Sequence, residues 1–195
     1  MASLDVRTAP EMRDLLRDQL SAHGTTAIVV THDVLDAVVL ADRVAVLVDG
    51  RLVDAGPTAG VLAAPRNPFT ADLAGVNLVM GAADAGAVRA PDGRSFVGSP
   101  DLGPGLTDGT PLAAVFRPSA VVVHTDEPRG VSARNVWPAR VLSLEASPAG
   151  VRLRTSGRPE VLADLTPASV AALGIVPGAA VWLSVKATEV GLHRR

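Results

Sequence analysis

The sequence predicts an α/β segment followed by an all-β region of small, OB-like barrels. Two observations predict this division. The first part combines helical spacing with an apolar strand-like run, and from about Val76 onward short β-rich runs alternate with Pro and Gly turns. Many short strands with frequent turns are typical of small barrels rather than of further α/β sheet. We therefore expect a domain boundary near residue 75.

A β-branched apolar run, Thr25 to Val30, predicts a strand buried on both faces. It ends in Thr31-His32-Asp33. Ligands of open α/β sheets lie beyond the carboxyl ends of the strands, which makes His32 a candidate to face one. The alternative is that His32 only caps the next turn. Residues 34–43 then predict a helix of about two turns, and residues 43–56 a hairpin that turns at Asp49-Gly50.

A capping box opens the first predicted helix. Thr8 and Glu11 can satisfy the free amides of its first turn, and Gly24 is suited to end it. An apolar stripe runs from Met12 to Leu20, so we expect a packing helix. Its charged residues are expected to form the solvated face: Arg13, Asp14, Arg17 and Asp18.

Composition excludes several classes of function. The chain has 195 residues and a net charge of −2, which argues against nucleic acid as a partner. It has no cysteine, and its four histidines lack metal-ligand spacing, so we expect no metal site. No signal peptide is recognisable, and Gly174 and Pro177-Gly178 divide the apolar stretch 168–185 into a short helix and a strand. We expect a cytoplasmic protein without direct membrane insertion.

Residues 31–57 resemble the switch-histidine segment of ABC-transporter ATPases. The resemblance lies in Thr31-His32-Asp33, Leu40-Ala41-Asp42-Arg43, Gly50-Arg51-Leu52-Val53 and Gly56-Pro57. It implies that the α/β segment is the C-terminal part of an ABC ATPase sheet, with His32 as the catalytic switch histidine at the γ-phosphate. Residues 2–7 resemble the D-loop of the same ATPases, with Asp5 as its acid.

Other parts of such an ATPase are missing from the sequence. A phosphate-binding loop needs Gly-x-x-x-x-Gly-Lys-Ser/Thr, and the one place with the right glycine spacing, Gly98 and Gly103, has Pro104 where lysine is required. The signature motif and the acidic strand also have no counterpart. We therefore expect no independent ATP hydrolysis, and ATP with Mg²⁺ only in a complete parent subunit.

Two segments bracket the last part of the chain, and each offers a cation, a hydroxyl and small-residue amides. These groups suit a tetrahedral oxyanion, although each segment alone is an ordinary strand with a surface charge. Together, over residues 130–192, they resemble the Mop or TOBE domain of molybdate-binding proteins. The resemblance implies molybdate or tungstate as ligand, with sulfate left open. It also implies a set of ligand residues, in which Asn135 is expected to tie the turn and Arg134 to act through its amide: Ser132, Ala133, Arg134, Asn135, Lys186, Ala187 and Thr188.

The predicted domains are 1–75 (ATPase portion), 76–129 (β-rich connector or first barrel) and 130–195 (Mop/TOBE domain). Residues 109–121 can be aligned with 178–190 as an internal repeat, but two unrelated barrel strands could align equally well. Arg117 and Ser119 match the site only through this repeat, so we leave them out of the site.

The combined resemblance implies the C-terminal part of the ATP-binding subunit of a molybdate importer, with a regulatory oxyanion-binding domain. The expected partners are a second copy of the chain and a membrane permease, which would hold the protein at the inner face of the membrane. Two alternatives stay open: a stand-alone molybdate or tungstate sensor or store, and a TOBE-bearing regulatory subunit of another importer.

Overall fold

The protein is described by a computed structural model that covers residues 8–100 and 106–195. Asp5 and the rest of the predicted D-loop lie outside these residues. The chain forms two compact units that divide between Ala63 and Ala64. The domain limits 1–75, 76–129 and 130–195 stay a prediction. Mixed α/β structure followed by β-rich structure agrees with the predicted fold class.

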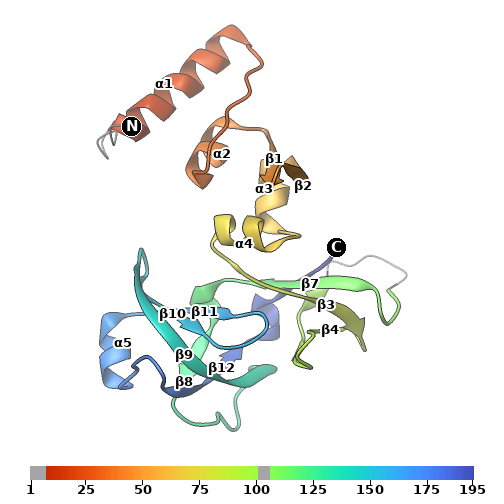
Figure 1. Ribbon diagram of the computed structural model, residues 1–195, viewed down its shortest axis with the longest axis vertical. Coiled ribbons are helices and arrows are strands. Elements are labelled where there is room, and N and C mark those ends of the chain that lie inside the picture. The colour runs from red at the N-terminus through yellow and green to blue at the C-terminus, as the bar shows by residue number, and fades with distance from the viewer. Residues whose placement is uncertain (1–7, 101–105) are drawn as a thin grey trace. The chain divides into compact units, whose positions relative to one another are not determined.

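Over residues 8–63, the first unit consists of helices and one hairpin (Figure 1). The hairpin turns at Asp49 and Gly50, with φ of 49° and 72°. Positive φ at both central residues is the requirement of a type I′ turn, so the predicted hairpin is confirmed. The elements are α1 (Thr8–His23), α2 (Val34–Leu40), β1 (Arg43–Val48), β2 (Arg51–Pro57) and α3 (Thr58–Ala63).

The prediction of a buried strand at residues 25–30 is wrong for this structure. The segment belongs to no sheet of the described chain, and Ile28 and Val30 are 93% and 96% exposed. A strand buried on both faces needs paired neighbours and covering elements, whereas the only sheet of the described part of this unit is the β1–β2 hairpin. Without such neighbours, an apolar run alone does not make a strand.

The second unit is β-rich and is built from two sheets. The five-stranded sheet has the order β11-β10-β9-β12-β8, and the six-stranded sheet has the order β5-β4-β3-β7-β13-β6. The elements are α4 (Pro68–Ala74), β3 (Asn77–Asp84), β4 (Ala87–Arg89), β5 (Ser95–Phe96), β6 (Ser99–Pro100), β7 (Pro111–Phe116), η1 (Pro118–Ala120), β8 (Val122–His124), β9 (Asn135–Ser147), β10 (Gly150–Thr155), β11 (Val161–Leu165), α5 (Pro167–Ala172), β12 (Ala180–Val185), η2 (Ala187–Glu189) and β13 (Gly191–Arg194).

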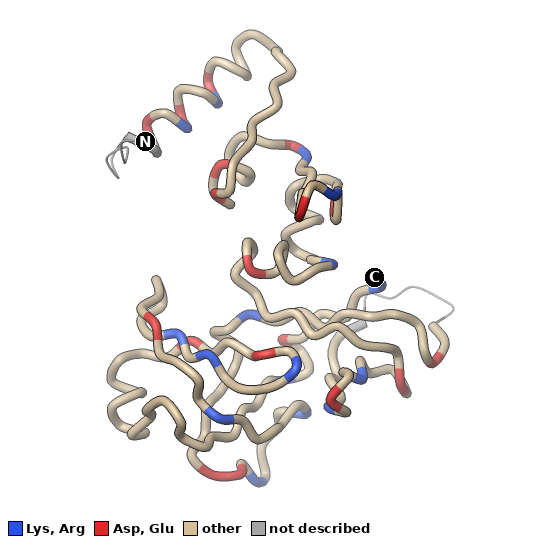
Figure 2. The backbone as a smooth tube through the Cα atoms, viewed as in Figure 1, with Lys and Arg blue, Asp and Glu red and all other residues tan. Residues whose placement is uncertain are grey.

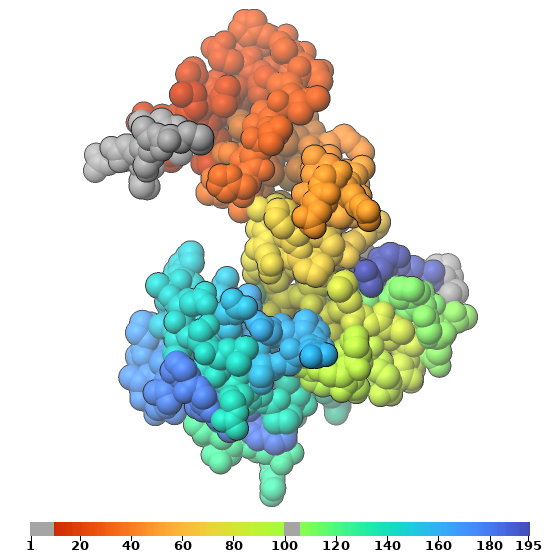
Figure 3. All heavy atoms as spheres, in the orientation of Figure 1, coloured from red at the N-terminus to blue at the C-terminus, as the bar shows by residue number. Residues whose placement is uncertain are grey.

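One hydrophobic core joins both sheets of this unit. It contains Val79 and Leu112 from one sheet and Leu153 and Leu183 from the other, all fully buried. Figure 3 shows the yellow-green segment around β4 and β5 against the light-blue segment that precedes β11, where Arg94 donates a hydrogen bond to the carbonyl oxygen of Pro159 at 2.9 Å. The two sheets are therefore packed as one folded unit.

The apolar stretch 168–185 is divided as the sequence predicts. The Thr166 side chain caps α5 by accepting a hydrogen bond from the amide of Ser169 at 3.1 Å, and Gly174 follows the helix with φ of 60°. The stretch then enters β12. In the part of the chain that is described, none of the helices has both the length and the apolar character that crossing a membrane requires.

Candidate functional site

A polar pocket of about 670 Å³ lies at the carboxyl end of β12 in the β-rich unit. It combines three hydroxyls, two cations, one imidazole and one carboxylate with small apolar residues. Its lining residues are Arg117, Ser119, Ala120, Val122, His124, Val131, Ser132, Ala133, Ser184, Lys186 and Glu189.

Strand register explains why residues so far apart in sequence meet here. β12 is flanked by two antiparallel strands, and Ser184 lies opposite Val122 of β8 and Val136 of β9. Lys186 follows β12 directly, η1 precedes β8, and residues 131–133 precede β9. Because antiparallel neighbours run in opposite directions, the segments just before β8 and β9 lie beside the end of β12.

The buried hydroxyl of the pocket is hydrogen-bonded to the partly buried imidazole. Ser184 is 3% exposed, and its Oγ lies 2.9 Å from Nε2 of His124. Trp182, opposite His124, and Ser184 share one face of β12 because side chains alternate along a strand. This pair therefore fixes a hydroxyl and an imidazole in the pocket wall, with the direction of the hydrogen bond set by the histidine tautomer.

The charged groups of the pocket are at its surface. Arg117, Lys186 and Glu189 are all exposed. Two cations with several hydroxyls suit an oxyanion, because charge-assisted hydrogen bonds to anionic oxygens are short and strong. Among the described residues, no group of His, Asp and Glu could hold a metal ion. Figure 2 shows positive and negative residues interspersed along the chain, so a cationic pocket is a local feature of a weakly acidic protein.

The structure brings three of the predicted ligand residues into this pocket: Ser132, Ala133 and Lys186. Arg134, Ala187 and Thr188 do not line it, and the latter two begin the short helix η2. The polar residues of the pocket that the sequence did not assign are Arg117, Ser119, His124, Ser184 and Glu189. The internal repeat pointed to the first two, and no sequence signal pointed to His124.

Asn135 has a structural position. It is 1% exposed, its Oδ1 accepts from the amide of Val97 at 2.7 Å, and its Nδ2 donates to the carbonyl oxygens of Val97 and Val185 at 2.9 and 3.2 Å. Both amide hydrogens are thus used by the backbone. Asn135 holds the segment that carries Ser132 and Ala133, and its side chain has no donor left for a ligand.

His32 lies in an exposed turn before α2 in the first unit. Asp33 caps α2 by accepting from the amide of Leu35 at 2.8 Å, and Thr31 donates to Asp36 at 2.6 Å. The structure thus leaves the His32 side chain accessible while the residues around it are held in place.

Arg13 organises this turn, so its assignment to the solvated face of α1 is wrong. Its side chain is only 11% exposed and donates to Asp36 at 2.8 Å and to Asp33 at 3.0 Å. The hydrogen bond from Thr31 lowers the pKa of Asp36, and the hydrogen bond and charge of Arg13 add to this against the opposing effect of burial. Arg17 remains half exposed, beside Asp14 and Asp18.

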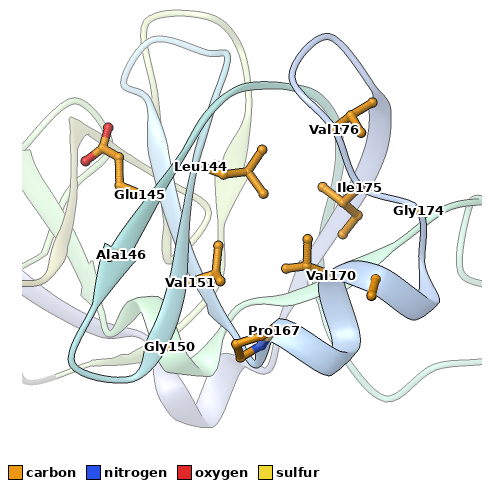
Figure 4. A pocket seen from close by; sticks show the side chains of 11 residues that line it. Leu144, Glu145, Ala146, Gly150, Val151, Pro167, Val170, Gly174, Ile175 and Val176 are labelled. Atoms are coloured by element: carbon orange, nitrogen blue, oxygen red, sulfur yellow. The ribbon is translucent and has the colours of Figure 1, made fainter.

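A second hollow, of about 540 Å³, lies between the β9–β10 hairpin and α5. Figure 4 shows Leu144, Val151, Val170 and Ile175 pointing into it, with the carboxylate of Glu145 turned away. It is lined by no cation, and an unpaired anion is costly to move from water into apolar surroundings. The two hollows therefore differ in chemistry, and only the pocket at β12 suits an oxyanion.

Comparisons with known proteins place these features in a family context. The TOBE domain family matches residues 131–192. The chain is 39% identical over 198 residues to the molybdenum import ATP-binding protein ModC of Mycobacterium tuberculosis, an alignment that covers 99% of this chain and 53% of that protein. It is 29% identical over 194 residues to the sulfate/thiosulfate import ATP-binding protein CysA 2 of Chromobacterium violaceum, covering 97% and 51%.

A solved structure of the cytoplasmic molybdate-binding protein ModG, with molybdate bound, has a similar fold. The TM-score is 0.50 at 20% identity, and the match covers 61% of this chain and 96% of that one. The chain spans about half the length of the relatives it matches. It thus carries a TOBE domain and resembles, over nearly its whole length, the C-terminal part of the ATP-binding subunits of molybdate-type ABC importers.

Proposed function

We propose that this chain acts as the C-terminal part of the ATP-binding subunit of a molybdate importer, and that its TOBE domain is a regulatory molybdate-binding domain. The observation that carries this proposal is the pocket at β12, where Ser132 and Ala133 meet Lys186. All three residues lie in the TOBE segment of a chain that is 39% identical to a molybdenum import protein.

The pocket supplies the chemistry that a tetrahedral dianion needs. Lys186 offers a charged donor, Ser132 offers a hydroxyl, and the amides around Ala133 add backbone donors. Asn135 positions the Ser132 segment through its three backbone hydrogen bonds. Arg134, Ala187 and Thr188 are next to lining residues in sequence but do not line the pocket, so we assign them no direct contact with the anion.

Regulation follows from linkage between ligand binding and the arrangement of the transporter. An anion that binds one arrangement more tightly shifts the transport equilibrium by that difference in affinity. Cytoplasmic molybdate would then inhibit its own import. In the complete parent subunit, His32 would contact the γ-phosphate of ATP and Asp5 would belong to the D-loop. A permease and a second copy of the chain are the proposed partners, at the inner face of the membrane.

Two other functions have specific support. Similarity to a sulfate/thiosulfate import protein favours a TOBE-bearing subunit of a different importer. The fold shared with the cytoplasmic molybdate-binding protein ModG supports a stand-alone molybdate or tungstate sensor or store. The first alternative predicts a different anion or none, and the second predicts molybdate binding without association with a permease.

Calorimetric titration of the full chain with molybdate, tungstate and sulfate tests these functions. We expect molybdate to bind, and Lys186→Ala to weaken binding by about tenfold or more because a charge-assisted hydrogen bond is lost. Arg129→Ala is the matched control. Arg129 is an exposed cation in the connection between β8 and β9, which also carries Ser132, but it does not line the pocket. Binding of sulfate alone would favour the other importer. If none of the three anions binds, the regulatory proposal is wrong.

A further inference from the structure

The β-rich unit contains two matching series of elements, one in each half of the unit. The strand–3₁₀ helix–strand series β7, η1 and β8 has the same lengths and spacings as the start of the series β12, η2 and β13. The matching positions keep one constant offset in residue number, which pairs Phe116 with Val185, Arg117 with Lys186 and Ser119 with Thr188. The internal repeat is therefore a structural repeat.

The match extends to the first strand of each half. Asn77 begins β3 and pairs with Phe116, while Asn135 begins β9 and pairs with Val185. Both asparagines are buried, and each bonds to the backbone amide and carbonyl of one distant residue, Leu162 for Asn77 and Val97 for Asn135. Two independent sets of positions thus give the same alignment of the halves.

Each half gives its last strand to the sheet of the other half. β8 of the first half pairs with β12, and β13 of the second half pairs with β7 (Figure 1). This exchange brings the Arg117–Ser119 turn of the first half to the end of β12, where both residues line the pocket with Lys186. The pocket is consequently made by both halves of the repeat.

From this arrangement we infer that Arg117 and Ser119 are ligands of the oxyanion and that the chain holds one such site, not two. The inference rests on the proposed oxyanion-binding function and adds the residues that determine its charge and stoichiometry. Arg117 supplies a second cation beside Lys186. The pocket then has two positive charges for a dianion, against the one negative charge of Glu189. The planar guanidinium can donate two parallel hydrogen bonds to two anionic oxygens.

The counterpart of the pocket in the other half has lost two of its three hydroxyls, because Thr188 still matches Ser119. The alignment places Ala74 at the position of Ser132 and Val115 at the position of Ser184. Neither side chain can donate a hydrogen bond. The counterpart keeps the buried asparagine that holds the fold and the Thr188 hydroxyl, but it lacks the hydroxyls that correspond to Ser132 and Ser184. A single site per chain follows.

Calorimetry with molybdate on the full chain tests this inference. We expect a stoichiometry near one per chain, with Arg117→Gln weakening binding by about tenfold or more and Ser119→Ala by several-fold. Arg117→Lys should retain more affinity than Arg117→Gln, because it keeps the charge. Arg129→Gln is the matched control and should bind like wild type. Unchanged circular dichroism of each variant would exclude misfolding.

The outcomes separate the two proposals. If wild type binds molybdate and Lys186→Ala is impaired, but Arg117→Gln binds like wild type, the inference is overturned and the proposed function stands. Two equivalent sites per chain would also overturn it. If wild type binds none of molybdate, tungstate and sulfate, the proposed function itself fails, and this inference with it.

Discussion

Asn77 and Asn135 make the same contacts in the two halves of the β-rich unit. The Oδ1 of each accepts a backbone amide at 2.7 Å, from Leu162 and Val97 respectively, and the Nδ2 of each donates back to the carbonyl oxygen of the same residue at 2.9 Å. Each buried amide side chain thus pairs with the N–H and C=O of one backbone residue, as a neighbouring strand would. The two residues are structural equivalents, and Asn135 is the one that begins the strand next to the pocket residues Ser132 and Ala133.

Replacing Asn135 should therefore affect stability more than anion affinity. Asn135→Ala leaves three backbone groups without their partner, and leaving buried polar groups unpaired typically costs about 1–3 kcal/mol each, so we expect a loss of about 2–3 kcal/mol after local relaxation. Urea unfolding measures this loss. Asn77→Ala is the matched variant, with a similar expected loss. A large drop in molybdate affinity for folded Asn135→Ala, with little loss of stability, would show that Asn135 is a ligand.

Acid should weaken the contact between α1 and α2. The pKa of Asp36 is lowered in the fold from its ordinary value of 3.8, mainly by the hydrogen bond from Thr31, with further lowering by Arg13. A lowered pKa in the folded state means that the ionised carboxylate stabilises the fold above the unfolded pKa and that this contribution is lost as the pH falls through the lowered value. We expect protection of α1 amides from hydrogen exchange to fall below about pH 4.

Arg13→Met tests the same contact at neutral pH. It removes two hydrogen bonds from a mostly buried side chain, so we expect faster amide exchange in α1 and a rise in the pKa of Asp36 measured by carboxyl NMR. Arg17→Met is the control, because Arg17 is half exposed and bonds only within α1. Equal effects of the two substitutions would contradict the role given to Arg13.

Asp164 and Arg152 form a cross-strand pair between β10 and β11. Two parallel hydrogen bonds of 2.7 and 2.9 Å join them, Asp164 is 8% exposed, and the hydrogen bond raises the pKa of Arg152. Asp164→Asn should cost about 1–2 kcal/mol in urea unfolding, because a charged partner of a half-buried guanidinium is lost. Glu160→Gln breaks the exposed pair with Arg154 and should leave stability unchanged. A larger effect of Glu160→Gln would contradict this account.

The amides of residues 25–30 should exchange rapidly with solvent. The segment belongs to no sheet of the described chain and exposes Ile28 and Val30. The strands β9 and β12, in contrast, are paired and contribute side chains to the hydrophobic core. Locally open segments exchange far faster than core strands, so hydrogen-exchange mass spectrometry should show exchange at least about a hundredfold faster for residues 25–30. Protection equal to that of β12 would show that the segment pairs as a strand in solution.

Local signals in the sequence predicted the elements that local chemistry determines. Asp49-Gly50 requires the positive φ values that the hairpin shows, and Thr166 caps α5 at the predicted place. The prediction of a strand at residues 25–30 failed, because a strand forms only beside neighbouring strands. Residues 25–30 have no such neighbours in the described chain. Arg13 looked like a surface charge because its partners are 20 and 23 residues away in sequence.

The pocket was predictable only in part, because several of its residues are far apart in sequence and meet only through strand pairing. Ser132, Ala133 and Lys186 carry a family resemblance, so sequence alone could single them out. His124 and Ser184 become neighbours through the pairing of β8 with β12, which crosses between the two halves of the repeat. Arg117 and Ser119 depend on the same exchange, and the repeat that signals it is weak in sequence although regular in structure.

The most direct test of the account is the position of a bound molybdate in a crystal of the full chain. Molybdenum scatters anomalously, so its site can be located without prior assumptions. The account predicts one anomalous peak per chain in the pocket at β12, within hydrogen-bond reach of Lys186 and Arg117. A peak at the apolar hollow beside α5, or no ordered peak in crystals soaked with saturating molybdate, would contradict it.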